Sequence, residues 1–280
     1  MRDYVVADVF TDVALQGNPV AVFTDGEGLS PETMQRAARE LNLSETVFVL
    51  PPEGGADARL RIFTPATELP FAGHPVLGTA FVLGERDGGH EISLLTGSGL
   101  VRVRLQRDGE RVYHGEMEQP LPTWSEFDRA PELLAALGVG TSELPVEVYD
   151  NGPRHAFVAL DSIDAVIRLR PNLAALADVG EIGVSCFALA GDGQVRTRMF
   201  APALGVAEDP ATGSAAGPLA VHLARHGWTR FGQRIEIRQG EEIGRPSRLE
   251  AMADGSASTL ERLRVGGGAV IVAAGGYRLD

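Results

Sequence analysis

Residues 208–223 read EDPATGSAAGPLAVHL, and this stretch decides how the rest of the chain is interpreted. Pro210 fixes its own φ and keeps Asp209 out of the α region, which predicts a turn. Small and apolar residues follow, with Thr212 or Ser214 as a cap, and predict a buried helix over residues 213–226. The first turn of such a helix leaves backbone N–H groups without intrahelical acceptors, and these suit a carboxylate or phosphate.

The same pattern occurs earlier in the chain. Three pairs of segments correspond in the same order: GNP (17–19) with GP (152–153), RIFTPA (61–66) with RMFAPA (198–203), and HPVLGTA (74–80) with DPATGSA (209–215). Such a series predicts a duplicated lobe. The match also predicts that His74 and Asp209 stand at equivalent helix starts.

Composition restricts the class of protein. The chain has 280 residues, of which 44% are hydrophobic and 22% charged, as in a soluble globular protein with room for two lobes. The net charge of −13 argues against nucleic acid or a membrane surface as partner, but leaves room for a small anionic substrate. The apolar runs are too short to span a bilayer, and the N-terminus has no signal-peptide pattern. We therefore expect a cytoplasmic protein. The single cysteine, Cys186, fits a reducing compartment.

The order of expected elements predicts an α+β fold with two pseudo-symmetric lobes, each a curled mixed β-sheet around a central buried helix. Pro120-Leu121-Pro122 is the best candidate for a linker, which divides the chain into an N-terminal lobe, 1–118, and a C-terminal lobe, 119–280. Helices are expected at residues 31–41, 75–83, 131–137, 171–179 and 213–226.

Three ionisable residues are candidates for chemistry. Glu45 begins a strand where the second copy has Val184, so a carboxylate stands in only one copy. The alternatives are structural: Glu45 as an exposed strand-edge residue, His74 as a helix cap and Asp209 as a turn acceptor. The paired placement of His74 and Asp209 favours a functional role.

The other polar groups give weaker indications of function. Cys186 lies in an apolar strand pattern, which indicates a core residue. His155 and His222 also fall in apolar segments and are interpreted as core or interface groups. No set of His, Cys and carboxylate residues shows metal-ligand spacing, so we expect no metal. The glycine-rich stretch Gly97-Ser98-Gly99 lacks the strand–turn–helix context of a dinucleotide loop, so we expect no nucleotide cofactor.

Five motifs are spread over the chain: DVFT (8–11), GNP (17–19), LSET (43–46), FAGHP (71–75) and EDPATGSA (208–215). Together they resemble the PhzF family of phenazine-biosynthesis-like isomerases. The resemblance implies lobes of the diaminopimelate-epimerase type, a site in the cleft between them and a homodimer. It also implies that a strand from residues 262–280 completes the first lobe. Ala207 departs from the pattern, since many members have glycine there.

The resemblance implies that Glu45 transfers the proton, with His74, Asp209 and Ser214 completing the site. The expected activity is a cofactor-independent isomerisation that moves a proton on a small carboxylate-bearing substrate by general acid–base catalysis. The N–H groups near Gly73 and Gly213 and the Ser214 hydroxyl are expected to hold its anionic parts.

Two alternatives stay open at this point. One is a non-catalytic module that binds a small molecule or a protein on the same fold. The other is a racemase or epimerase, whose chemistry uses paired thiols and is disfavoured by the single cysteine. Phenazine-producing members act on a dihydro-hydroxyanthranilic acid, but the motifs do not specify the substrate of this chain.

Overall fold

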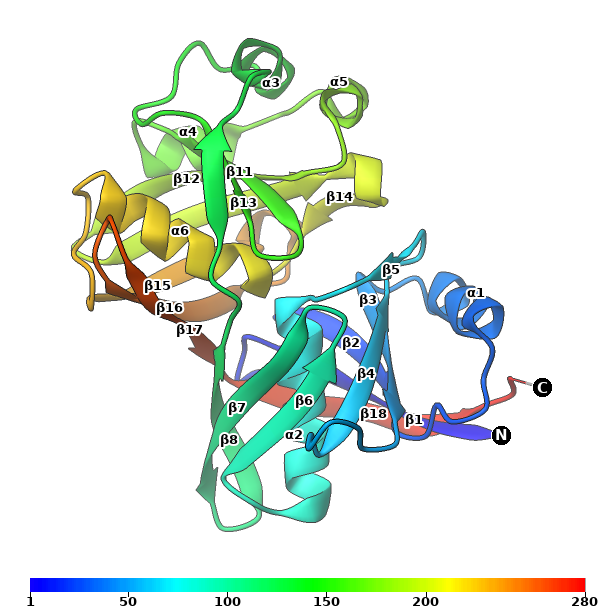
Figure 1. Cartoon of the computed structure of the whole chain (residues 1–280). Helices are drawn as coiled ribbons and strands as arrows, with labels where there is room; N and C mark the ends of the chain where they lie inside the picture. The colour runs from blue at the N-terminus through cyan, green and yellow to red at the C-terminus, as the bar shows by residue number, and fades with distance from the viewer. Residues whose placement is uncertain (280) are drawn as a thin grey trace. The chain divides into compact units, whose positions relative to one another are not determined.

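The computed structural model describes residues 1–279, which form two compact units (Figure 1). Unit 1 consists of Met1–Glu118 together with the chain from Gly266 onward, and unit 2 consists of Gln119–Val265.

Unit 1 contains nine strands and two helices among its described residues. They are β1 (Arg2–Val9), β2 (Asn18–Phe23), α1 (Pro31–Leu41), β3 (Glu45–Leu50), β4 (Ala58–Phe63), β5 (Glu68–Leu69), α2 (Gly73–Asp87), β6 (Glu91–Thr96), β7 (Gly99–Asp108), β8 (Arg111–Glu118) and β18 (Ala269–Tyr277).

Unit 2 has more helices. Its elements are β9 (Thr123–Glu126), α3 (Ala130–Leu137), β10 (Glu147–Asp150), β11 (Arg154–Ala159), α4 (Ile163–Arg168), α5 (Leu173–Val179), β12 (Gly183–Gly191), β13 (Gln194–Ala201), the 3₁₀ turn Pro202–Leu204, β14 (Val206–Asp209), α6 (Gly213–Arg225), β15 (Arg234–Gln239), the 3₁₀ turn Glu241–Ile243, β16 (Ser247–Gly255) and β17 (Leu260–Gly267).

Strand pairing follows the same order in both units. In unit 1, β2 runs parallel to β3, β3 antiparallel to β4, β4 antiparallel to β5 and parallel to β6, and β6 antiparallel to β7. In unit 2, β11 to β16 repeat these five pairings with the same directions. At the other side of each sheet, β1 pairs with β2 and β18, and β10 pairs with β11 and β9. Both sheets are therefore mixed, and the class is α+β.

The strand register corrects one detail of the sequence match. Phe63 and Phe200 hold the same place in the repeated RIFTPA and RMFAPA segments. Phe63 pairs with Thr46, and Phe200 pairs with Val184. The counterpart of Glu45 is consequently Gly183, and the predicted counterpart, Val184, is wrong by one residue.

The helix starts are also related differently from the prediction. Three residues separate β5 from α2, and three separate β14 from α6. His74 is thus the second residue of α2, and the second residue of α6 is Ser214, whereas Asp209 ends β14. The sequence match was misleading because Pro75 lies inside the first turn of α2, where a proline needs no N–H acceptor and does not end the helix.

Both central helices are buried on all sides, as their small residues predict. Every residue from 73 to 84 in α2 and from 213 to 223 in α6 is buried. In unit 1, α2 packs against β1, β2, β7 and β8, and in unit 2, α6 packs against β11 and β16 (Figure 1). A Cβ at Gly78 would come within 2.7 Å of Val20, so glycine there allows α2 to approach the sheet closely.

Elements with local signals match the predictions most closely. The helix predicted at residues 31–41 is α1, with Pro31 in its first turn and the Ser30 side chain accepting from the amide of Thr33 at 3.2 Å. The helix α4 was not predicted, and α5 begins at Leu173, after an Asn172 cap, rather than at residue 171.

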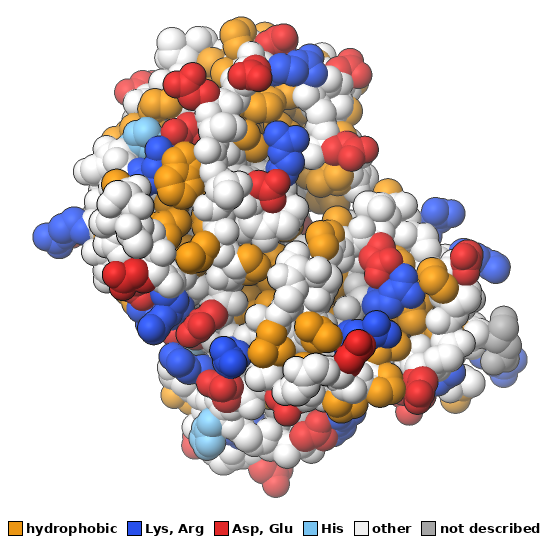
Figure 2. All heavy atoms as spheres, in the orientation of Figure 1, with side chains coloured by type: hydrophobic (Ala, Val, Ile, Leu, Met, Phe, Trp, Pro, Cys, Tyr) orange, Lys and Arg blue, Asp and Glu red, His pale blue; other side chains and the backbone are white. Residues whose placement is uncertain are grey.

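The surface carries both signs of charge. On the face shown in Figure 2, acidic and basic side chains are interspersed with apolar and neutral ones. Within residues 1–279, no helix has the length and apolar character needed to cross a membrane.

Candidate active site

Unit 1 brings Glu45 and His74 together. Glu45 is the first residue of β3, opposite Val20 of β2, and His74 lies in the first turn of α2. The Glu45 Oε2 atom is 3.3 Å from His74 Nε2, with the two side chains 14% and 4% exposed. Glu45 therefore keeps some access to solvent, and its alternative interpretation as an exposed strand-edge residue does not fit this partly buried position.

The His74 ring is held on its other side by the start of β2. Asn18 Nδ2 lies 3.2 Å from His74 Nδ1. Burial lowers the pKa of His74 to about 3, against the opposing effect of a backbone hydrogen bond with Pro19. The imidazole is therefore neutral near pH 7, and it lies beside Glu45 as an uncharged ring rather than as a cation.

The sequence alone did not identify Asn18 as a site residue. Asn18 is fully buried and follows Gly17, whose φ of +67° belongs to the left-handed region that favours glycine. The GNP motif was the available signal, since it combines this turn with a polar residue at the start of an apolar strand.

In unit 2, a polar turn leads from Asp209 into α6. The Thr212 hydroxyl donates to Asp209 Oδ2 at 2.6 Å. Gln239 Nε2 donates to the Asp209 carbonyl at 2.7 Å and to Thr212 Oγ1 at 2.9 Å. The Asp209 carboxylate thus accepts within the turn, as one interpretation of the sequence expected, and the bond from Thr212 also fixes its direction.

Each central helix begins with backbone donors. The amides of Ala215 and Ala216 both reach the Thr212 carbonyl at 3.1 Å. Gly213 and Ser214 precede them and have no acceptor within the helix. In unit 1, Gly73 and His74 hold the corresponding positions at the start of α2. Each unit thus offers two N–H groups to an anion, under the favourable end of the helix dipole.

A largely buried ion pair holds the chain immediately before Asp209. Arg198 Nε and Nη2 each donate to the Glu208 carboxylate at 2.8 Å. Arg198 Nη1 also donates to the carbonyl of Leu169 at 2.9 Å. In unit 1, Arg61 and Glu68 form the corresponding pair, with both distances 2.7 Å, nearer the surface.

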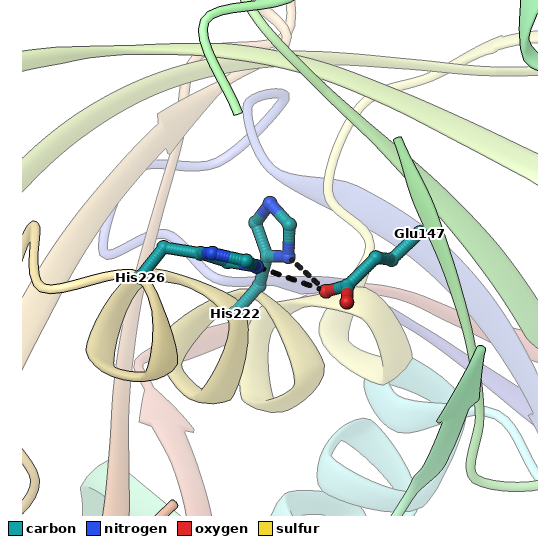
Figure 3. Close-up of side chains that lie close together, drawn as sticks. All are labelled: Glu147, His222 and His226. Carbon is teal, nitrogen blue, oxygen red and sulfur yellow. Dashed lines mark hydrogen bonds and ion pairs between the residues drawn. The ribbon is translucent and has the colours of Figure 1, made fainter. Parts of the chain in front are cut away.

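The far end of α6 is fastened by a cluster around Glu147 of β10 (Figure 3). Glu147 Oε2 lies 3.2 Å from His222 Nδ1 and 3.0 Å from His226 Nε2. Arg225 Nη1 lies 2.7 Å from the same oxygen. Burial raises the pKa of the Glu147 carboxyl, but hydrogen bonds from His222, Arg225, His226 and Tyr149 outweigh it and hold that pKa far below its usual range.

Glu147, His222 and His226 could together offer three ligand atoms to a metal ion, which corrects the expectation that the chain has no such set. It was missed because Glu147 lies far from the two histidines in sequence. The guanidinium of Arg225 already supplies the positive charge beside the carboxylate, so we interpret the cluster as the anchor between α6 and β10.

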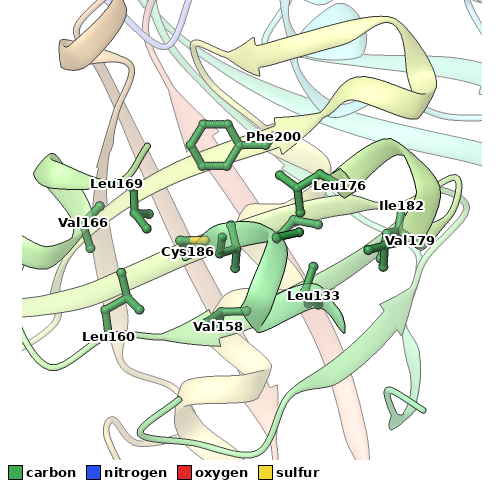
Figure 4. Close-up of a cluster of buried hydrophobic side chains, with 14 of the residues drawn as sticks. Leu133, Val158, Leu160, Val166, Leu169, Leu176, Val179, Ile182, Cys186 and Phe200 are labelled. Atoms are coloured by element: carbon green, nitrogen blue, oxygen red, sulfur yellow. The ribbon is translucent and has the colours of Figure 1, made fainter. Parts of the chain in front are cut away.

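Cys186 is a core residue, as predicted. It lies in the apolar cluster between α3, α4, α5 and the strands of unit 2 (Figure 4). Burial raises the pKa of its thiol to about 12. A thiol with so high a pKa supplies almost no thiolate near neutral pH, so Cys186 does not act as a nucleophile.

Comparison with known proteins identifies the family. A profile of the PhzC-PhzF family, described as phenazine biosynthesis-like protein, matches residues 7–275. The chain belongs to this family. The trans-2,3-dihydro-3-hydroxyanthranilate isomerase of Pseudomonas fluorescens is 54% identical over 270 residues, covering 96% of this chain and 97% of the relative.

Solved structures show the same fold. A predicted epimerase from Pseudomonas aeruginosa has a TM-score of 0.83 at 32% identity and covers 98% of both chains. A probable proline racemase from Agrobacterium radiobacter shares the fold, with a TM-score of 0.75 at 16% identity over 100% of this chain and 94% of that one. The α+β fold and the PhzF resemblance are confirmed. This PhzF protein is an isomerase, and a non-catalytic binding module is not favoured.

Proposed function

We propose that the protein isomerises trans-2,3-dihydro-3-hydroxyanthranilate, or a closely related cyclic carboxylate, by moving one proton between carbon atoms without a cofactor. The name of the relative that is 54% identical over nearly the whole chain supports this substrate class. The contact of Glu45 with His74, at 3.3 Å in unit 1, carries the proposal for the chemistry.

Glu45 is the proposed base. Its carboxylate takes a proton from one carbon of the substrate, and the electron pair left behind enters the conjugated system. The resulting carboxylic acid, whose O–H hydrogen exchanges with solvent, then delivers a hydrogen to another carbon. Nothing is oxidised or reduced, so the step balances without a co-reactant. A positioned general base contributes about 10²–10⁴-fold to the rate.

His74 supports this cycle in its neutral form. A cation beside Glu45 would stabilise the carboxylate and make it a weaker base, whereas the neutral ring leaves it basic. The ring can also share a proton with Glu45 through their contact. Burial keeps the pKa of His74 at about 3, so the ring stays neutral throughout the physiological range.

The helix starts are the proposed anion-binding groups. The N–H groups at Gly73 and Gly213 and the hydroxyl of Ser214 would stabilise the substrate carboxylate and the negative charge that develops on proton removal. Fixed donors of this kind contribute roughly 10²–10³-fold each in a well-studied case. Asp209 would orient the substrate through a polar group or take part in proton transfer.

The protein is proposed to work as a cytoplasmic homodimer, as the family resemblance implies. The direct test is to incubate the protein with trans-2,3-dihydro-3-hydroxyanthranilate in D₂O and follow the carbon positions by NMR. We expect conversion to an isomer that carries deuterium at a carbon. If the compound is recovered unchanged and free of carbon-bound deuterium, it is not the substrate of this protein.

A further inference from the structure

His155 is a second buried histidine whose side chain reaches a helix start. It lies on β11 of unit 2 and is 3% exposed. Its Nε2 atom is 3.0 Å from Ser214 Oγ. The sequence suggested a core or interface residue, but this contact places the imidazole directly against a proposed substrate-binding hydroxyl.

The neighbouring strand leaves room for this ring. Gly183 of β12 stands opposite His155 in the parallel ladder. A Cβ added to Gly183 would come within 2.6 Å of His155 Nδ1. Such an approach is closer than packed atoms tolerate, so the ring position depends on glycine at residue 183.

The duplicated topology gives this arrangement a counterpart. In unit 1, the same parallel strand pair brings Val20 opposite Glu45, and Glu45 contacts His74, the second residue of α2. In unit 2, the contact to the second helical residue is made from the other strand, by His155 to Ser214. Each unit thus uses one side chain of this strand pair to hold the side chain at its helix start.

The direction of the hydrogen bond follows from the other ring nitrogen. Within residues 1–279, His155 Nδ1 is buried and has no hydrogen-bond partner. Burial lowers the pKa of His155 to about 4, so the ring is neutral near pH 7 and carries a single N–H. An N–H on Nδ1 would be a buried donor without an acceptor, which is rarer than an unpaired acceptor. The proton therefore belongs on Nε2, from which it donates to Ser214 Oγ.

A second side chain holds the backbone of Ser214. Pro218 lies four residues further along α6 and has no N–H to donate to the Ser214 carbonyl. Asn151 Nδ2 donates to that carbonyl instead, at 3.0 Å. Both the backbone and the hydroxyl of Ser214 are thus fixed by residues of β11 and the turn that precedes it.

We propose that His155 is a positioning residue, which donates to Ser214 Oγ and thereby directs the hydroxyl proton of Ser214 toward an anionic group of the substrate. The inference rests on the proposed function in one respect, namely that Ser214 contacts the substrate. It assigns His155 no proton transfer of its own.

A double-mutant cycle tests this role. The variants are Ser214→Ala, His155→Leu, His155→Gln and the double variant Ser214→Ala/His155→Leu. We expect His155→Leu to lower kcat/KM by about tenfold, partly through KM because the substrate carboxylate is already present in the ground state, and to have little further effect once Ser214 is alanine. His155→Gln keeps an N–H donor near the Nε2 position and should recover most of the loss. Gly183→Ala should resemble His155→Leu, because it displaces the ring. Additive losses in the double variant would overturn the proposal.

A second readout does not depend on turnover. In protein labelled with ¹⁵N-histidine, the His155 signals, assigned with His155→Gln, should show the Nε2–H tautomer at pH 7.5. The Nδ1–H tautomer would overturn the proposal, because Ser214 would then donate to the ring. The cycle is also run on the binding of anthranilate, a stable aromatic carboxylate. If the parent binds anthranilate but does not convert trans-2,3-dihydro-3-hydroxyanthranilate, the proposed function fails. The coupling between His155 and Ser214 in anthranilate binding then still decides the role of His155.

Discussion

The hydrogen bond from Asn151 to the Ser214 carbonyl makes a quantitative prediction about α6. The carbonyl is buried, and Pro218 removes the N–H that would normally serve it. In Asn151→Ala the carbonyl loses its side-chain donor, which should lower the free energy of unfolding by about 1–3 kcal/mol. Adding Pro218→Ala restores an N–H four residues along the helix. We therefore expect the double variant to recover about 1 kcal/mol or more of that loss.

Urea unfolding followed by far-UV circular dichroism measures both effects, with the slope on urea concentration checked for constancy. Asn172→Ala is the matched control, because Asn172 caps α5 by accepting from the amide of Ala175 at 3.1 Å. Its loss of about 1 kcal/mol should be the same with Pro218 or alanine at residue 218. A cost of Asn151→Ala that Pro218→Ala leaves unchanged would refute the account of how Ser214 is held.

Three further predictions concern His155, Arg198 and Cys186. The pKa of His155 is depressed in the folded protein, so the unfolded chain binds the proton first and stability falls as the pH drops below about 6.5. Between pH 8 and pH 5 the protonation of this ring should lower the free energy of unfolding by about 2 kcal/mol, so His155→Gln should reduce the pH dependence of urea unfolding by that amount. An unchanged pH dependence would contradict a buried neutral ring. Arg198→Met leaves the carboxylate of Glu208 without its partner and should lower the free energy of unfolding by about 3–5 kcal/mol in thermal or urea unfolding. Arg61→Met, in the more exposed counterpart pair, should cost about 1 kcal/mol or less. Equal costs would show that burial does not set the difference. Cys186→Ala should leave turnover intact and destabilise the fold modestly through a small cavity, while loss of activity in a folded variant would restore thiol chemistry.

Local patterns in the sequence predicted the parts of the fold that depend on local physics. The cap and proline before α1, the small residues of α6 and the repeated order of strands all act within short segments. The α+β class followed from these. The first residue of α2 could not be predicted in this way, because a proline in the first turn of a helix looks the same in sequence as a proline that precedes the helix.

Candidate site residues could be named where a motif marks them, but not where distant partners decide their surroundings. Glu45 and His74 stand in recognisable motifs, and the structure brings them together. His155 could not be interpreted from its own segment, since its role depends on the one-residue register that places Gly183 beside it. The Glu147 cluster likewise needs a strand and a helix that are separated by more than seventy residues.

The central claim is that Glu45 carries the proton, and the most direct measurement compares Glu45→Gln with the parent in D₂O. Glutamine keeps the shape of the side chain and most of its hydrogen bonding but cannot accept the proton. With trans-2,3-dihydro-3-hydroxyanthranilate as substrate, we expect the rate of deuterium entry at carbon to fall by at least roughly 10²-fold, while the affinity for anthranilate stays close to that of the parent. Deuterium exchange at the parental rate in Glu45→Gln would contradict the claim.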